Sequence, residues 1–446
     1  MKILGFIKSA TLLIAFSSAS IAASAKTWTL EECIQYAMDN NISLQRSGLT
    51  RQSSQEDWES AKAQLLPSLN FSSSHRVNYQ PWPNDNAAKV IDGQAQLTMD
   101  KVYYNGSYSV NANWTVWNGN INRNQIKASK LSTDAAEQDS ITTALNLQEQ
   151  IAQLYIQILY TKEAIKVNKS TLEAAKVNEE RGKQMLEVGS MSKADVSQLT
   201  ATRALDEYNV VQAESQTRSY IRQLKQLLQI TNEEPFDVAD RTELTDMMAL
   251  QTIPTVSSVY NRAIENRPEI KSSDIAIESA ELQRKMATAR RLPTVSMNAS
   301  LGSNTNTMTE TRWDKQMKTN FNMGAGVTVS VPILDQRQTR TAVNKAIIQK
   351  QSAQLEKQNK QTTLYSTIEN YWIQAENYQN QYKAAKVSTE SAKDSYDLLS
   401  EQFAVGLKNI VELQDGKTRL LSAQQNELQS KYMTILNIKM LEFYKK

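Results

Sequence analysis

The segment 321–331 reads FNMGAGVTVSV, in which apolar residues occupy every second position and small polar residues or glycine lie between them. Residues 107–116, SYSVNANWTV, and 294–301, TVSMNASL, show the same alternation, and residues 68–79 follow it less regularly. Strict alternation predicts β-strands with one apolar and one polar face. A half-buried sheet would also have this pattern. However, a polar face of Ser, Asn, Thr and Gly on strands of about ten residues is typical of strands that cross a bilayer.

The predicted strands cover about 68–80, 104–117, 294–305 and 319–332. Aromatic residues gather near their ends, as they do at membrane surfaces. These candidates are Tyr79, Trp82, Tyr103, Tyr104, Trp114, Trp117, Trp313 and Phe321. Four strands cannot close a barrel, and lipid tolerates no unpaired backbone edge, so further copies of the chain must complete it. Two copies would give eight strands and a filled interior, whereas three give twelve strands and a water-filled pore. We therefore expect a homotrimer in contact with lipid.

Long helices are the second expected component. The chain of 446 residues has only 12 Gly and 8 Pro, and the tracts 84–234 and 333–446 contain no proline. Helices are predicted over 121–188 and 340–405, each roughly 100 Å long, with return helices over 194–230 and 410–444. Ile151, Ile158, Ile165 and Leu172 recur every seven residues, which indicates a coiled-coil seam. Outside this seam, the predicted helices carry many polar residues. One packed face and one hydrated face are what the wall of a water-filled helical tube requires.

The chain is an internal duplication. At an offset of 226, Leu66-Pro67 recurs as Leu292-Pro293, and at an offset of 217, Val188-Gly189 recurs as Val405-Gly406. Each copy has a short helix (30–40 and 256–266), an amphipathic stretch (43–66 and 269–292), two strands and a long helical hairpin. The expected organisation is a first repeat over 26–230, a linker over 231–255 and a second repeat over 256–446. The fold class is thus mainly α with β.

Residues 1–25 have the composition of a secretory signal peptide, with two lysines, an apolar run and the small residues Ala23-Ser24-Ala25. Without that segment, 48 basic residues face 47 acidic ones, so no nucleic-acid partner is indicated. A single His and a single Cys exclude a zinc cluster and a disulfide framework, and no cofactor or metal is expected. Cys33 is predicted to be a half-buried thiol of the first helix.

Each long helix reverses at a glycine, which supplies the left-handed backbone of a helix C-cap. The two turns, 188–196 and 405–413, lie at the far ends of the rods, roughly 100 Å from the strands. Glu412 and Asp415 are three residues apart and share one face of the return helix. They are either functional acids or solvated acids near a helix N-terminus, where the macrodipole favours them.

The chain resembles the TolC-like outer-membrane efflux proteins over essentially the whole of its length after the expected signal segment 1–25. The resemblance rests on the duplicated Leu-Pro before a strand, on the two Val-Gly turns and on Arg267-Pro268-Glu269-Ile270, which is similar to the family's Asn-Pro-Glu-Leu. It rests also on Ile333-Leu334-Asp335 with Arg340 at the start of the second long helix. The resemblance implies a homotrimer with a twelve-stranded barrel in the outer membrane of a Gram-negative bacterium and a helical tunnel in the periplasm.

The resemblance also implies partners and site residues. The tips would dock to a periplasmic adaptor, which joins the channel to an inner-membrane pump of the RND, ABC or MFS type, for efflux or type I secretion. The docking residues would be Val188, Gly189, Ser190, Val405, Gly406 and Leu407. The gate at the tip constriction would comprise the acids Asp195, Glu412 and Asp415, the basic Lys408 and the aromatic Phe403. Ser190, Asn409 and Arg267 depart from the family pattern.

Other functions fit less well. Gly324-Ala325-Gly326 lacks the third glycine of a phosphate-binding loop and lies within a predicted strand, and the sole histidine, His75, lies in another, where we expect an interfacial or loop-end residue. We therefore expect no enzymatic activity. The alternative is a periplasmic coiled-coil adaptor, or a structural envelope protein without a channel. Adaptors have one helical hairpin, whereas this chain has two.

Overall fold

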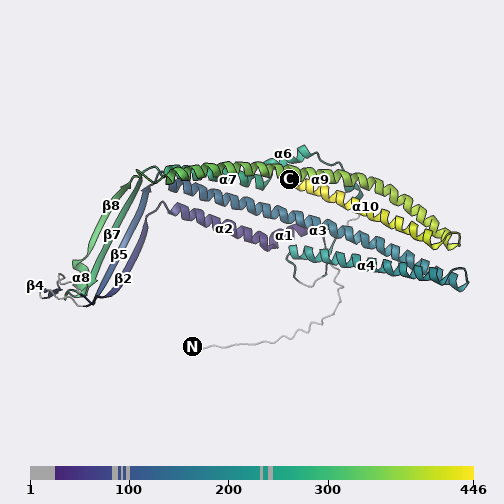
Figure 1. Cartoon of the computed structure of the whole chain (residues 1–446), viewed down its shortest axis with the longest axis horizontal. Coiled ribbons are helices and arrows are strands. Elements are labelled where there is room, and N and C mark those ends of the chain that lie inside the picture. Colours follow the sequence, from purple (N-terminus) through teal and green to yellow (C-terminus); the bar gives the residue numbers. More distant parts are fainter. Residues whose placement is uncertain are drawn as a thin grey trace, which may run out of the picture.

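The computed structural model describes residues 26–82, 89–91, 94–96, 101–231, 235–239 and 245–445. The expected signal segment 1–25 lies outside these residues. A β-sheet forms one end of the molecule, and long helices run from it to two turns at the opposite end (Figure 1). The expected class, mainly α with a smaller β part, is confirmed.

The sheet contains β2 (Ser68–Tyr79), β5 (Val102–Trp117), β7 (Thr294–Asn306) and β8 (Asn322–Ser330), in the order β2-β5-β7-β8 and antiparallel throughout. The register pairs Phe71 with Val110 and Leu301 with Met323. Side chains alternate between the two faces of a strand, so this pairing collects the apolar residues on one face. That face is bare in the single chain, since Phe71 and Met323 are 69% and 76% exposed.

The last strand is shorter than the sequence predicted. It begins at Asn322 instead of about 319, because helix α8 (Trp313–Thr319) occupies the preceding residues. The side chain of Gln316 fixes this helix: its amide donates to the carbonyls of Asn306 and Thr311 at 2.9 and 2.7 Å. The strand ends at Ser330, two residues before Pro332, which has no N–H to donate to a ladder.

Within the described residues, each repeat has four helices that have a counterpart in the other repeat. In the first they are α1 (Leu30–Asn40), α2 (Ile42–Ala63), α3 (Ile121–Glu187) and α4 (Lys193–Leu227). In the second they are α6 (Val256–Asn266), α7 (Pro268–Ala289), α9 (Gln338–Ala404) and α10 (Ile410–Lys445). Both long helices, α3 and α9, contain 67 residues. In the first repeat α2 and α4 follow one another along α3, and in the second α7 and α10 follow one another along α9 (Figure 1).

The meeting point of α2 and α4 shows how this arrangement is held. Asn41 caps α2 by accepting from the N–H groups of Ser43 and Leu44, and its side-chain amide donates to the carbonyl of Leu227 at 2.9 Å. One side chain therefore satisfies the start of α2 and the end of α4, both of which have unpaired backbone groups.

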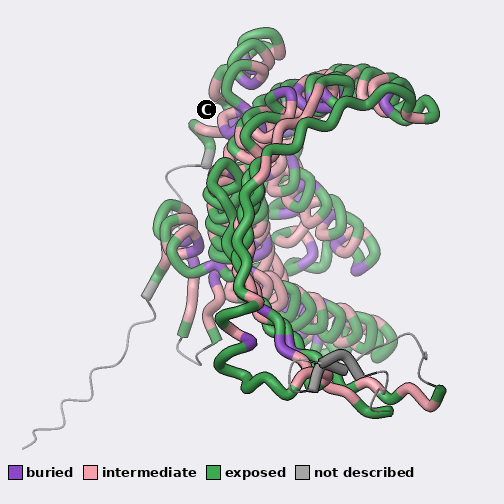
Figure 2. The backbone as a smooth tube through the Cα atoms, turned by 90° about the vertical axis from the view of Figure 1, so that its left-hand side faces the viewer, coloured by how far each residue is buried: buried purple, intermediate pink, exposed green. Residues whose placement is uncertain are grey.

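The hydrophobic core is thin and follows the helix contacts. Buried residues form short separate stretches along the rods (Figure 2). In the predicted seam, Ile151 and Ile158 are fully buried and Leu172 is 8% exposed, whereas Ile165 is only half-buried. Cys33 is fully buried against this seam, where we expected a half-buried thiol, and burial raises the pKa of its thiol to about 12.

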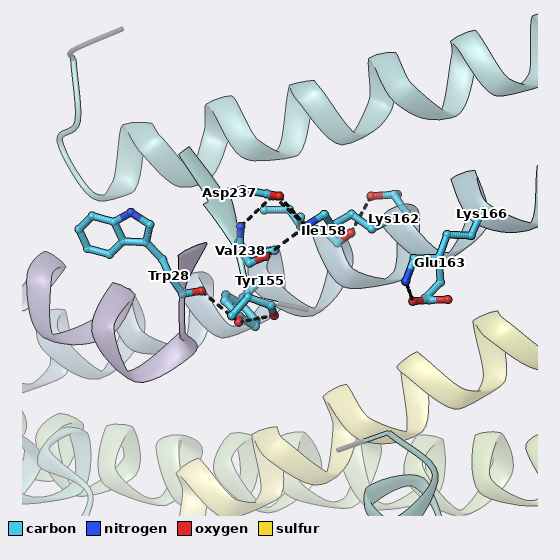
Figure 3. Close-up of polar contacts among 10 residues, drawn as sticks. Trp28, Tyr155, Ile158, Lys162, Glu163, Lys166, Asp237 and Val238 are labelled. Atoms are coloured by element: carbon cyan, nitrogen blue, oxygen red, sulfur yellow. Dashed lines mark hydrogen bonds and ion pairs between the residues drawn. The ribbon is translucent and has the colours of Figure 1, made fainter. Parts of the chain in front are cut away.

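A joint that the sequence did not reveal lies midway along the rods. Strand β1 (Lys26–Trp28) pairs in parallel with β6 (Phe236–Val238), so the segment 231–255 is more than a linker. The Tyr155 hydroxyl of α3 donates to the carbonyls of Trp28 and Ala239 at 3.2 and 3.1 Å (Figure 3). Lys162 adds a 2.8 Å ion pair to Asp237. The start of the described chain and the segment between the repeats are thereby bound to the first long helix.

The segment between the repeats is also bound to the second repeat. Its short helix α5 (Thr245–Ala249) places Asp246 between Lys386 of α9 and Lys431 of α10, at 3.2 and 2.6 Å. The hydrogen bond from Lys431 is the largest of several contacts that lower the pKa of Asp246 to about 2. Together with β6, this helix joins the two repeats at mid-length.

Candidate functional site at the helical tips

The two hairpin turns have the same backbone geometry. Gly189 and Gly406 have φ angles of 73° and 77°, in the left-handed region that favours glycine. The N–H of Gly189 donates to the Leu186 carbonyl, and that of Gly406 to the Phe403 carbonyl, both at 3.0 Å. These bonds close the last turn of α3 and of α9 in the same way. Both glycines have open space around them.

Apolar side chains project from both turns. Val188, Val405 and Leu407 are 79%, 70% and 75% exposed, although hydrophobic residues of this size are usually buried. Ser190 takes the place of Leu407 in the first turn, and its hydroxyl donates to the Met185 carbonyl at 3.0 Å. The second turn therefore presents the larger apolar surface.

The acidic candidates lie close to the turns but in different local settings. The Ser192 hydroxyl accepts from the N–H of Asp195 and donates to its carboxylate at 2.7 Å, so Asp195 lies in the first turn of α4 and is bonded to its N-cap residue. Asp415 pairs with Arg419 at 2.9 Å, and both side chains are mostly exposed. Asp195 and Asp415 thus each interact with a neighbouring residue along the chain, and the side chain of Asp415 is accessible to solvent.

Lys408 and Glu412 meet directly. The ammonium of Lys408 lies 2.5 Å from the carboxylate of Glu412, which also accepts from the N–H of Asn409 at 3.2 Å. The hydrogen bond from Lys408, followed by that from Asn409, holds the pKa of Glu412 below its ordinary value. Glu412 is therefore ionised at neutral pH, and the pair is lost only as the pH falls through the lowered pKa.

Phe403 is not at the surface of the tip. Its side chain is 1% exposed and packs with Leu199, Tyr396, Ile410 and Leu413 from three helices. The expectation that it lines a constriction is wrong for this conformation, because a buried ring cannot contact the contents of a channel. Phe403 is the penultimate residue of α9, and its ring lies between the two hairpins.

Contacts between the two hairpins are a feature of the tip region that the sequence did not reveal. Lys417 of α10 forms a salt bridge with Asp206 of α4, and their side chains are 12% and 6% exposed. Beside it, Gln414 donates to Thr202 at 2.8 Å and accepts from Gln198 at 3.0 Å. Each partner is about 210 residues distant along the chain, so no local pattern could have paired them.

Within each hairpin, a glycine permits close helix packing. A Cβ atom added at Gly182 of α3 would lie 2.5 Å from the Cδ1 atom of Leu199, and one added at Gly416 of α10 would lie 2.6 Å from that of Leu399. A leucine of the facing helix thus occupies the space of the missing side chain. The two legs of each hairpin are held together near the turn.

The described part of the chain contains no group of three or more His, Cys, Asp or Glu residues placed to hold a metal ion. Over the same ranges, no helix combines the length and the apolar content needed to cross a membrane. The sole histidine, His75, lies within β2, where its ring contacts Tyr104 and Tyr108.

The sequence matches a known protein family and several known proteins. The family model described as outer membrane efflux protein matches residues 33–229 and 259–438. The chain is 20% identical to outer membrane protein TolC of Salmonella enteritidis, over 96% of this chain and 83% of that protein. It is 21% identical to outer membrane efflux protein BepC of Brucella suis, over 74% and 70% of the two chains.

Solved structures show the same fold. The Campylobacter jejuni CmeC outer membrane channel superposes with a TM-score of 0.76 at 18% identity, and covers 99% of this chain and 94% of its own. The open state of the Neisseria gonorrhoeae MtrE outer membrane channel gives a TM-score of 0.73 at 16% identity, over 93% and 88% of the chains.

Proposed function

Because the chain belongs to the outer membrane efflux protein family, we propose that its two tips, 188–196 and 405–413, dock to a periplasmic adaptor of a tripartite export system. The protein is an outer-membrane channel of Gram-negative bacteria, a non-enzymatic exit duct for efflux. Family membership implies a homotrimer and overrides the alternative of an adaptor or a structural protein without a channel. Three four-stranded sheets would close a twelve-stranded barrel.

The exposed apolar turns are the observation that carries the docking proposal. Val188, Val405 and Leu407 stand at the ends of rods that extend away from the sheet. Exposed apolar residues gathered at one place are typical of interaction sites. In this proposal the adaptor connects the duct to an inner-membrane pump of the RND, ABC or MFS type.

Docking is tested by crosslinking from the turns. We expect Ser190→Cys and Leu407→Cys to form disulfides or short thiol crosslinks with a co-expressed adaptor that carries cysteines in its helical hairpin. The native Cys33 is fully buried with a raised pKa, so it contributes no background. Cysteine at Val387, 65% exposed within α9, is the matched control. Crosslinks from Val387→Cys but not from the turns would contradict the proposal.

Export gives a second measurement of the same surface. Leu407→Asp should abolish export because it places a charge in an apolar contact, whereas Leu407→Met should retain it. Both variants should still form heat-modifiable trimers in the outer membrane, since the side chain of Leu407 is 75% exposed in its own chain. Full export by Leu407→Asp would show that this turn is not part of the contact.

We further propose that Asp195, Glu412, Asp415 and Lys408 form the gate. Three copies around the axis would place like charges in rings that attract cations, as in the acidic rings of cation channels. The 2.5 Å pair between Lys408 and Glu412 supports a role for Lys408 in limiting that repulsion. Phe403 would act indirectly, by packing the hairpins beneath the rings.

Neutralisation of the acids tests the gate in planar bilayers. Glu412→Gln with Asp415→Asn should raise the leak conductance and weaken block by multivalent cations, because two rings of charge are removed. In the unaltered channel, cation block should persist at neutral pH and fade only in acid, as the pH passes through the lowered pKa of Glu412. The pair Glu163→Gln and Glu173→Gln, on α3, is the control. Conductance and block like those of the unaltered channel would refute the assignment.

A further inference from the structure

A basic pocket lies where the helices meet the sheet. It has a volume of about 610 Å³ and opens between the start of α3 and the end of α7. Arg123 and Lys127 of α3 line one side, and Arg284, Lys285 and Arg291 line the other. Its apolar lining includes Leu292, which is 44% exposed and directly precedes the Pro293 before β7. The pocket therefore combines a cationic rim with an apolar part.

Most of this positive charge is not neutralised by the protein. Arg284 is bonded to Glu281 at 2.6 Å, but no salt bridge among the described residues involves Arg123, Lys127, Lys285 or Arg291. The sequence around the pocket is also rich in basic residues. Segments 118–133, 282–301 and 336–355, which flank the junction, together contain eleven Lys or Arg and no Asp or Glu. Such a concentration of like charge favours a bound anion.

The start of α3 adds to this preference. The positive end of a helix dipole normally attracts acids, yet the first turn of α3 contains none and carries Arg123 instead. Asn120, at the N-cap, has a left-handed backbone and makes no capping hydrogen bond with its side chain, and Asn118 accepts from the N–H of Asn122 at 3.2 Å in its place. An anion in the pocket would meet both the helix dipole and the basic side chains.

The location of the pocket relative to the sheet indicates which class of anion it would bind. The pocket begins two residues after β5 ends and closes just before β7 begins, so it lies at the helical side of the membrane-crossing sheet. The indole N–H of Trp114, on the apolar face of β5, donates to the Leu65 carbonyl at 2.8 Å, as interfacial tryptophans do. Phospholipid phosphates lie at this level, and Arg and Lys are the side chains that bind them.

We propose that this pocket binds the phosphate group of an anionic phospholipid in the leaflet next to the helices, with Leu292 against the adjoining hydrocarbon. The bound lipid anchors the junction of sheet and helices at a fixed depth. Arg123, Lys127 and Arg291 are the main ligands, because they are exposed and free of carboxylate partners within the described residues.

The test measures lipid binding to the full-length trimer in detergent by native mass spectrometry. Short-chain phosphatidylglycerol should bind more tightly than phosphatidylcholine, and inorganic phosphate should compete poorly. The triple variant Arg123→Gln, Lys127→Gln, Arg291→Gln should lower the affinity for phosphatidylglycerol about tenfold to a hundredfold. A triple variant of distant α9 lysines, Lys360→Gln, Lys383→Gln, Lys393→Gln, loses the same charge and should bind as the unaltered protein does.

Three results would overturn the proposal. Equal affinity for phosphatidylglycerol and phosphatidylcholine would remove the requirement for net negative charge. Equal loss of binding in the two triple variants would assign the effect to net charge alone. Displacement of phosphatidylglycerol by equimolar inorganic phosphate would make the pocket a site for free phosphate. None of these readouts depends on export, so they are independent of docking at the tips.

Discussion

Replacement of Lys417 with Met should destabilise the tip region by about 3–5 kcal/mol, because it leaves the Asp206 carboxylate buried without its partner. The side chain of Asp206 is only 6% exposed, so water cannot replace the lost ammonium. We expect faster hydrogen exchange in α4 and α10 near the turns and a higher leak conductance, since this salt bridge joins the two hairpins.

Two further variants separate the charge effect from loss of packing. Asp206→Leu with Lys417→Met replaces the ion pair by apolar side chains and should recover most of the stability, as buried pairs replaced as a unit usually do. Arg419→Met breaks the nearby exposed pair with Asp415 and should change stability by about 0–1 kcal/mol. If Lys417→Met exchanged no faster than Arg419→Met, the salt bridge would not hold the hairpins together.

The second large effect concerns the two faces of the sheet. Val327 of β8 is 60% exposed on the apolar face and pairs in register with Met297. Val327→Arg should destabilise the inserted trimer by about 2–4 kcal/mol per chain, because it places a charge against hydrocarbon near the middle of the bilayer. The yield of heat-modifiable trimer in the outer membrane and its denaturation midpoint measure this.

The adjacent residue supplies the control. Thr328 points to the opposite face, with Ser296 as its partner, so Thr328→Arg should leave assembly intact and change only ion selectivity. Loss of trimer with Thr328→Arg but not with Val327→Arg would reverse the assignment of the faces.

The sequence predicted the repeating elements well, because their signals are long. The alternation in 321–331 and the uninterrupted tracts around Ile151 set the sheet and the rods, and the short helices 30–40 and 256–266 match the structure at both ends. The side chains of Thr29 and Thr255 cap these two helices, which defines the residue at which each helix begins.

The features that were missed depend on contacts between distant segments. Strands β1 and β6 have three residues each, too few for any periodicity, and they form only because the start of the first repeat pairs with the segment between the repeats. The burial of Phe403 depends on how α4 packs against α9 and α10. The salt bridge between Asp206 and Lys417 reads in the sequence as two ordinary surface charges, and only the closeness of the hairpins buries it.

The equal length of the two rods has a mechanical consequence. Since α3 and α9 both span 67 residues, the two turns of a chain stand at one level, and a trimer presents an even rim. A flat partner can then touch every turn at once, at a standoff from the membrane set by helix rise and not by a flexible tether. Loss of one heptad from a single rod would lower its turn by about 10 Å and tilt the rim. Matched losses in both rods would shorten the reach and keep the rim level.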